Sequence, residues 1–257
     1  MGGLSRRAAK RRAPASGVLS PVWHDVECAA YTADLELWRG LAASAAGPIL
    51  DLGCGTGRVA LDLASRGHDV TGLDSEPDLV DTLRARARDR DLRIDAVAGD
   101  ARSFELGRAF ALAISPMQVV QLLGGPDGRA RMLTAVRRHL EPGSVFAAAL
   151  ANPFEGWSEA ESLPPLPDVR EQDGWVYSST PVDVRRTPGA FVIERRREAV
   201  SPSGDLTEEM SSIELDSVSA AELEGEAAGH GFEPRPRGTV PPTPDYVGSD
   251  IVVLEAV

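Results

Sequence analysis

The sequence has few of the residues that would indicate a disulfide-stabilised, metal-binding or membrane-spanning protein. Its 257 residues include two cysteines, Cys28 and Cys54, which form no C-x-x-C pair, so we expect no structural disulfide, and we expect no metal site. No apolar run approaches the ~18 residues of a membrane span. Ser5-Arg6-Arg7 lacks the apolar stretch that a twin-arginine signal needs behind it. We therefore predict a cytoplasmic protein with no membrane partner.

Charge is unevenly distributed along the chain, and this bears on nucleic-acid binding. Residues 1–12 hold five arginines and lysines and no acid, while the net charge of the whole chain is −12, which leaves −17 for the remainder. Such an acidic body argues against a broad nucleic-acid-binding face. We predict that residues 1–20 form a disordered basic tail. The alternative is a short arm that tethers the protein to RNA or to the ribosome.

What the sequence does contain is a glycine-rich turn between two apolar segments. Residues 49–52 run into Gly53, Gly55 and Gly57, a helical stretch follows, and a second apolar segment ends at Asp74. Glycine allows a tight turn and a close approach of ligand to backbone, and the free N–H groups of the next helix point into the turn. An acid about 20 residues further on can accept both hydroxyls of a ribose. The segment predicts a nucleoside-binding crevice.

The spacing of the glycines narrows the choice of nucleoside. The dinucleotide fingerprint is G-x-G-x-x-G, but here the pattern is G-x-G-x-G, and Arg58 stands where the third glycine would fall. A P-loop is excluded because no Gly-Lys-Ser/Thr follows the turn. Asp51 to Gly57 instead resembles the first motif of the class I S-adenosylmethionine-dependent methyltransferases, which reads as an acid, an apolar residue and then G-x-G-x-G.

The resemblance extends to two later strand ends. Residues 97–101 are similar to the third-strand exit of that family, and residues 110–115 are similar to its fourth strand. The resemblance implies S-adenosyl-L-methionine as the cofactor, with its ribose hydroxyls on Asp74 and its adenine amino group on Asp100. The residues implied in cofactor binding are Tyr31, Asp51, Gly53, Cys54, Gly55, Gly57, Asp74, Asp100, Ala101, Ser115 and Met117.

The order of the expected elements is that of a doubly wound α/β sheet. Helices are predicted at 58–66, at 76–90 with Ser75 as N-cap, and at 127–140; between them, strands are predicted at 49–52, 69–73, 94–98, 110–115 and 145–150. This alternation predicts a Rossmann-like, mostly parallel sheet. The resemblance implies seven strands, with 251–255 antiparallel beside the fifth. Residues 23–46 are expected to form one or two amphipathic helices, and 219–228 a helix that opens with a Ser219–Glu222 capping box.

The pattern changes after the fifth strand. Residues 153–172 are rich in proline and glutamate and are expected to form a loop, whereas three later segments alternate apolar and polar residues as antiparallel strands do. These segments are 175–185, 190–199 and 208–215. We predict four parts: the basic tail at 1–20, a cofactor-binding core with an N-terminal helical cover at 21–152, an antiparallel β insert forming an acceptor lid at 153–217, and the C-terminal part of the core at 218–257.

No residue is conspicuous as a catalyst, and methyl transfer does not demand one. Much of the acceleration can come from holding the acceptor close and aligned, an effect worth ~7–11 kcal/mol in well-oriented small-molecule reactions. A base helps only if the nucleophile arrives protonated. The catalytic residue stays open, with His24 the only histidine expected near the acceptor. Gln118, Asn152, Trp175 and Tyr177 are candidates for acceptor contact, and residues 195–197, all arginine, are expected to be a solvated strand edge.

The resemblance implies an enzyme that methylates an O or N atom of a small molecule and acts as a monomer or homodimer. Ser115-Pro116 matches the start of the motif that DNA and amide N-methyltransferases carry, but Met117-Gln118 lacks its second proline and its stacking aromatic. Two alternatives stay open. One is a methyltransferase of RNA or protein delivered by the basic tail, and the other is a non-catalytic cofactor-binding protein.

Overall fold

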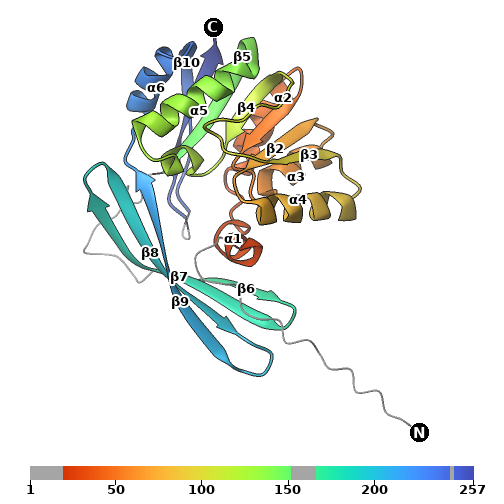
Figure 1. Ribbon diagram of the computed structural model, residues 1–257, viewed down its shortest axis with the longest axis vertical. Coiled ribbons are helices and arrows are strands. Elements are labelled where there is room, and N and C mark those ends of the chain that lie inside the picture. Colours follow the sequence, from red (N-terminus) through yellow and green to blue (C-terminus); the bar gives the residue numbers. More distant parts are fainter. Residues whose placement is uncertain (1–19, 152–165, 244–245) are drawn as a thin grey trace.

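The chain forms two sheets in the residues that the computed structural model describes, which are 20–151, 166–243 and 246–257 (Figure 1). The predicted tail, apart from residue 20, and the candidate Asn152 lie outside these residues. The larger sheet has seven strands and the second sheet has four. No helix in the described part of the chain is long and apolar enough to cross a membrane.

The larger sheet has the strand order β10-β11-β5-β4-β1-β2-β3. Strands β1 to β5 run parallel, and β11 is antiparallel to both β5 and β10. This confirms the predicted Rossmann-like α/β class and the antiparallel strand beside the fifth. The strands are β1 (Ile49–Leu52), β2 (Val70–Asp74), β3 (Ile94–Ala98), β4 (Phe110–Ser115), β5 (Leu140–Ala151), β10 (Phe232–Val240) and β11 (Ser249–Ala256).

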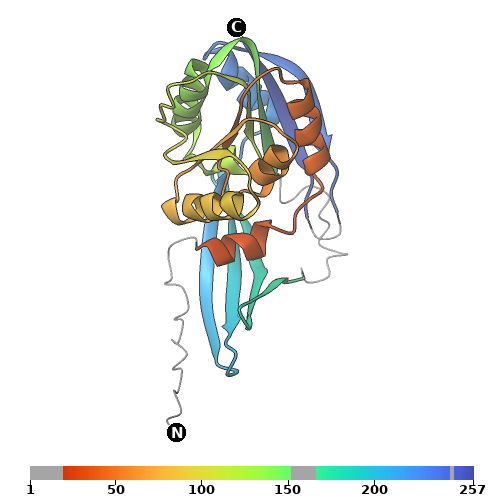
Figure 2. The same cartoon turned by 90° about the vertical axis from the view of Figure 1, so that its right-hand side faces the viewer.

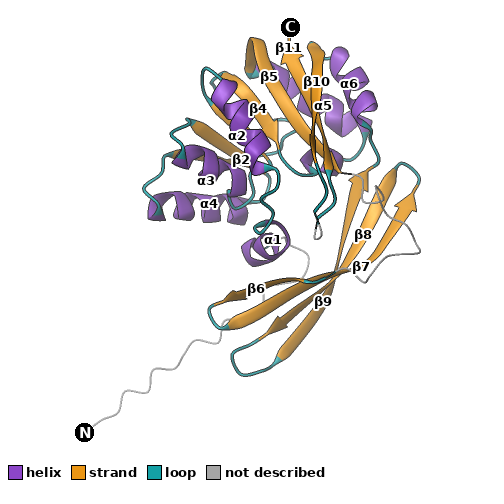
Figure 3. Ribbon diagram, turned by 180° about the vertical axis from the view of Figure 1, so that it is seen from behind, coloured by secondary structure: helices purple, strands orange, loops and turns teal. Residues whose placement is uncertain are grey.

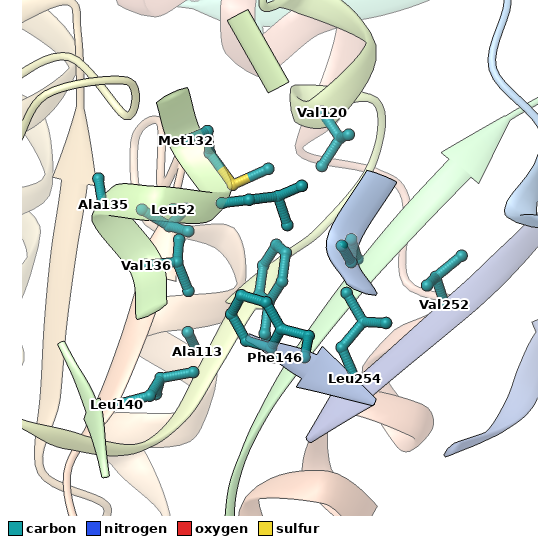
Figure 4. Packing of buried hydrophobic residues seen from close by; sticks show 14 of the residues in the cluster. Leu52, Ala113, Val120, Met132, Ala135, Val136, Leu140, Phe146, Val252 and Leu254 are labelled. Atoms are coloured by element: carbon teal, nitrogen blue, oxygen red, sulfur yellow. The ribbon is translucent and has the colours of Figure 1, made fainter. Parts of the chain in front are cut away.

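Helices cover both faces of the larger sheet (Figure 2). On one face lie α2 (Leu35–Ser44), α3 (Arg58–Ser65) and α4 (Pro77–Asp89), whose apolar residues pack around the fully buried Trp38. On the other lie α5 (Pro126–Arg138) and α6 (Ala220–Ala228), and there Phe146 and Leu254 from the sheet meet Met132 and Val136 from α5 (Figure 4). All four residues of β1 are buried, as expected of a central parallel strand.

The second sheet is antiparallel, with the order β6-β7-β8-β9, and lies in sequence between β5 and α6 (Figure 3). Its strands are β6 (Asp168–Gln172), β7 (Trp175–Thr187), β8 (Ala190–Val200) and β9 (Leu206–Asp216). Helix α1 (Pro21–Cys28) lies between the second sheet and the larger one, where Trp23 packs edge-on against Tyr177 at 5.3 Å. A four-residue 3₁₀ helix, η1 (Val119–Leu122), follows β4.

The side chain of Gln121 links the end of β5 to the end of the second sheet. Gln121 of η1 donates to the carbonyl oxygens of Ala151, where β5 ends, and Asp216, where β9 ends, at 3.0 and 3.1 Å. Its own Oε1 accepts the Ala151 N–H at 2.8 Å. The chain therefore leaves and re-enters the core at one point, beside the carboxyl end of β4.

Three sequence-based expectations are wrong in detail. Residues 168–172 are a strand rather than a loop, because a polar edge strand such as β6 lacks the apolar alternation that marks a half-buried one. The fifth helix ends at Arg138, because Leu140 already pairs with Phe110 in the sheet. Ser75 is not the N-cap of α4: that position is Glu76, and its N–H is accepted by Asp74 at 3.0 Å.

Candidate functional site

In the turn between β1 and α3, backbone conformation and the space available explain why the three positions are glycine. All three have positive φ, of 67° at Gly53, 54° at Gly55 and 98° at Gly57. A Cβ on Gly53 would stand 2.4 Å from Val119, and one on Gly57 would stand 2.4 Å from Leu83 of α4. Only glycine can therefore bring β1, η1 and α4 this close to the turn.

A cavity of about 610 Å³ opens at this turn. Its floor is the carboxyl end of the parallel strands, and its opposite wall is the face of β8 and β9 that carries Ile193, Arg195 and Ile213. Its volume falls in the range of pockets that bind small molecules and cofactors. Nine of the predicted site residues line it: His24, Asp51, Gly53, Cys54, Asp74, Asp100, Ala101, Met117 and Gln118.

Asp51 is the most unusual of these residues because its buried carboxylate has no hydrogen-bond partner among the described residues. The side chain is 1% exposed, and among the described residues neither carboxylate oxygen has a hydrogen-bond partner. Burial raises the pKa of Asp51 to about 7, and the nearby Arg58 offsets only part of that effect. A buried carboxylate without a partner is costly, and a cation placed beside it would remove the cost.

Asp74 ends β2 and ties the glycine turn to the cavity. One carboxylate oxygen accepts the Gly55 N–H at 2.8 Å and the other accepts the Glu76 N–H at 3.0 Å. Each oxygen keeps a second lone pair for a ligand. The two backbone bonds fix the carboxylate at the cavity, and the binding of ribose hydroxyls there stays a prediction.

Asp100 lies in the cavity wall with a partner that the sequence did not indicate. Arg102 binds both carboxylate oxygens, with Nε at 2.9 and 3.1 Å and Nη2 at 2.8 Å, and this guanidinium holds the pKa of Asp100 below its usual value. Arg102 lines the cavity as well. An adenine amino group would have to approach the lone pairs that Arg102 leaves on Asp100.

Met117 has a strained backbone where the end of β4 meets the cavity. Its φ is 58°, a left-handed conformation that is uncommon outside glycine. The strained turn directs residues 117–119 from the end of β4 into the cavity wall. Strain of this kind concentrates at binding sites.

Several predicted site residues lie outside the cavity. Tyr31 is buried against Tyr246 at 5.0 Å and under the guanidinium of Arg58, and the Oγ of Ser115 is buried behind the end of β4. Gly55 and Gly57 are covered by His24 and Leu83. Trp175 and Tyr177 stack on each other and pack against Trp23, on the far part of the β7 face. Their expected role in acceptor contact gains no support from their placement.

Sequence reasoning missed the charged residues of the cavity wall. Arginines 195 and 197 were expected at a solvated edge, but strand alternation turns both toward the cavity and leaves only Arg196 outside. Arg197 forms two hydrogen bonds with Glu27 of α1, at 2.8 and 3.0 Å. No local pattern could reveal this pair, because its members are 170 residues apart.

The floor of the cavity fits an α-amino acid as well as a nucleoside. Asp51 offers an unpaired carboxylate and Arg58 a guanidinium, both at the glycine turn and both lining the cavity. Arg58 is held by Asp34 through two hydrogen bonds of 2.5 and 2.7 Å. Opposite charges side by side match an ammonium and a carboxylate. Together with Asp74, they fit the methionine and ribose ends of S-adenosyl-L-methionine.

Comparison with known proteins gives the family. Residues 49–143 match the methyltransferase domain family. The chain is 30% identical over 147 residues to the dTDP-3-amino-3,4,6-trideoxy-alpha-D-glucopyranose N,N-dimethyltransferase of Streptomyces venezuelae, covering 57% of this chain and 53% of that enzyme. The chain thus aligns with about half the length of this curated relative. Other curated relatives include ubiquinone biosynthesis O-methyltransferases and an uncharacterized RNA methyltransferase.

Two solved structures extend the similarity beyond the matched domain. The S-adenosylmethionine-bound amino pentose methyltransferase from Micromonospora echinaspora superposes with a TM-score of 0.67 at 19% identity, over 96% of this chain and 100% of that one. The glycopeptide N-methyltransferase MtfA, in complex with S-adenosyl-L-homocysteine, is 26% identical with a TM-score of 0.57, over 87% of this chain and 86% of that one. Residues 49–143 thus belong to the methyltransferase domain family, and the whole chain shares its fold with solved S-adenosylmethionine-dependent methyltransferases.

Proposed function

We propose that this protein transfers the methyl group of S-adenosyl-L-methionine to a nitrogen or oxygen atom of a small molecule. The observation that carries the proposal is the cavity, which continues from the cofactor-type floor at the glycine turn to the inner face of β8 and β9. A cavity with both regions can hold a methyl donor and an acceptor in contact, which is the main requirement of the reaction.

In this proposal each wall of the cavity has its own task. Asp51, Arg58 and Asp74 bind the methyl donor, which supplies the methyl group as an electrophile. The second sheet and α1 act as a lid that holds the acceptor and excludes water. The β8 and β9 wall mixes apolar Ile193 and Ile213 with serine and charged side chains, so it suits a compact polar molecule better than an apolar one.

The substrates in the names of the relatives narrow the class of acceptor. The S. venezuelae enzyme and the amino pentose methyltransferase act on amino sugars by their names, and MtfA on a glycopeptide nitrogen. We therefore place amines of sugars and peptides first among the acceptors. The O-methyltransferases among the relatives keep hydroxyl groups in the proposal.

The test is a transfer assay with radiolabelled S-adenosyl-L-methionine and a panel of acceptors. Amino sugars, amino acids, short peptides and phenols would be compared, each with its N- or O-acetylated counterpart as a matched control. We expect label in at least one free amine or hydroxyl compound and none in its acetylated form. Tight binding of both S-adenosyl-L-methionine and S-adenosyl-L-homocysteine with no transfer to any acceptor would favour a non-catalytic binding protein.

Deletion of residues 1–12 addresses the alternative of an RNA or protein substrate. In our proposal the truncated protein methylates its acceptor at the wild-type rate, because the residues assigned to the donor and the acceptor all lie outside this segment. A loss of turnover on the true substrate when this segment is removed, with cofactor binding unchanged, would favour an RNA or protein substrate instead.

A further inference from the structure

His24 lies on α1 directly over the glycine turn and lines the cavity. Its Nδ1 is 3.4 Å from the hydroxyl oxygen of Thr56 and 4.0 Å from Oδ1 of Asp25. At the opposite edge of the ring, Nε2 is 2.2 Å from the point where a Cβ on Gly55 would stand. The imidazole therefore occupies the space that the missing side chain of Gly55 leaves, next to the cofactor-type floor.

The hydrogen bonds determine which ring nitrogen carries the proton. Thr56 donates its one hydroxyl hydrogen to Asp25 at 2.7 Å, because a carboxylate can only accept. The Thr56 oxygen is then an acceptor toward His24, so Nδ1 carries the hydrogen and Nε2 keeps its lone pair. Burial tends to raise the pKa of Asp25, but the neighbouring His24 and the hydrogen bonds from Arg86 and Thr56 outweigh burial and keep the carboxylate ionised.

Charged groups on α1, β2, α4, β6 and β8 surround the segment that carries this histidine. Asp25 on α1 is held by Arg86 of α4 at 3.1 Å and by Arg170 of β6 at 3.4 Å. Asp74 of β2 faces the turn through the Gly55 N–H. Glu27 of α1 is paired with Arg197 and Arg195 of β8, at 2.8 and 3.5 Å.

We propose that Nε2 of His24 takes up the proton that the acceptor loses when it is methylated, while Thr56 and Asp25 hold the ring; this rests on the proposed methyltransferase function. Bound S-adenosyl-L-methionine supplies the methyl group, and its sulfur keeps the electron pair of the broken S–C bond. The acceptor lone pair forms the new C–N or C–O bond, and the N–H or O–H hydrogen passes to Nε2 as a proton. The imidazolium then releases this proton to solvent.

The first experiment needs no acceptor. Uniformly ¹⁵N-labelled protein is saturated with S-adenosyl-L-homocysteine, and long-range ¹H–¹⁵N correlation spectra at pH 8 report which nitrogen of each histidine is protonated. His24 is assigned by the loss of its signals in His24→Gln. We expect a protonated Nδ1 and an unprotonated Nε2, with the balance shifting toward Nε2 in Thr56→Val. A hydrogen on Nε2 in the wild type would overturn the proposal.

The second experiment is kinetic and uses the acceptor found in the transfer assay. We expect His24→Gln to lower kcat by about 10²–10⁴-fold and to remove the acidic limb of the pH profile, with the Kd for S-adenosyl-L-homocysteine within about threefold of wild type. His68→Gln is the matched control, because His68 lies between α3 and β2, at the opposite end of the strands.

The outcomes separate this proposal from the one on which it rests. Wild-type turnover in His24→Gln, or a loss of cofactor affinity as large as the loss of rate, would overturn the role of His24 alone. No transfer by the wild-type protein to any acceptor would contradict the methyltransferase function itself.

Discussion

At the scale of single residues, Asp51 belongs to the sequence motif and is also a buried carboxylate without a hydrogen-bond partner among the described residues. A carboxylate buried without a partner would be selected against in a purely structural role, since an amide or apolar side chain would fit there at lower cost. Its position two residues before the G-x-G-x-G turn and in the cavity floor indicates that a bound cation completes it. Two consequences can be measured.

The stability of the cofactor-free protein should depend on the protonation of Asp51. Because its folded pKa of about 7 lies above the ordinary 3.8, the folded chain holds a proton at pH 5–6 that the unfolded chain has lost. Its contribution to the free energy of unfolding therefore falls as pH rises from about 4 to 7, by up to roughly 4 kcal/mol. Urea unfolding from pH 5 to 8 should show this decline in the wild type and not in Asp51→Asn. An equal decline in both proteins would contradict the unpaired carboxylate, and the exposed Asp89→Asn should follow the wild type.

The affinity for the cofactor should also depend on the protonation of Asp51, but it should rise with pH where the stability falls. An ammonium beside Asp51 favours the ionised form, so the Kd for S-adenosyl-L-homocysteine should rise as pH falls below 7. Isothermal titration calorimetry in two buffers of different ionisation enthalpy would also detect release of a proton on binding at pH 6. Asp51→Asn should bind weakly at every pH and release no proton.

Asp74 should control cofactor affinity through the ribose hydroxyls. Replacing it in Asp74→Ala leaves those hydroxyls and the Gly55 N–H without an acceptor, and the binding free energy should weaken by about 1–3 kcal/mol, or roughly 5- to 150-fold in Kd. Calorimetric titration with S-adenosyl-L-homocysteine measures the change. Asp78→Ala, at an exposed position four residues later, is the matched control. Wild-type affinity in Asp74→Ala would mean that the ribose lies elsewhere.

At the scale of elements, the sequence patterns were reliable wherever burial follows a simple period. The strands predicted at 49–52, 94–98 and 110–115 and the capping box at Ser219 are confirmed residue by residue. Strand β6 was missed because both its faces are largely polar, and β10 was given no bounds because Pro234 and Pro236 interrupt it, which only an edge strand tolerates. The period of apolar residues indicates an element with a buried face, and it gives no signal for an element that is largely exposed.

The contact between α1 and the second sheet depends on the ion pair of Arg197 and Glu27. Arg197→Met would remove two charge-assisted hydrogen bonds from Glu27, which keeps Ser179 at 2.7 Å and Arg195 at 3.5 Å, and the free energy of unfolding should fall by about 1–3 kcal/mol. Arg196→Met, on the outer face of the same strand, should change it by no more than about 0.5 kcal/mol. Urea unfolding followed by tryptophan fluorescence measures both. Adding Glu27→Gln to Arg197→Met should restore part of the loss, and a failure to do so would show that the pair is not coupled.

At the scale of the whole molecule, the cavity is a product of tertiary assembly, since the larger sheet supplies its floor and α1 and the second sheet supply its walls. A ligand that contacts all three should stabilise the native state as a unit. At a free concentration of 100 times Kd, S-adenosyl-L-homocysteine should add about 2.7 kcal/mol to the free energy of unfolding, which raises Tm by roughly 5–10 °C. Differential scanning calorimetry measures this shift. Asp74→Ala at the same ligand concentration should show less of it, and an equal shift in both proteins would place the ligand outside the cavity.

The sequence by itself determined the doubly wound sheet, the glycine turn and the acids at the ends of β1 and β2. It could do so because each depends on local properties: period of burial, backbone freedom at glycine, and the fixed geometry of a βαβ unit. Only the tertiary structure decided that Arg195 and Arg197 face the cavity and that His24 fills the space over Gly55. These pairings join residues distant in sequence or choose between two faces of a strand. Contacts of that kind are determined by packing, which no local pattern records.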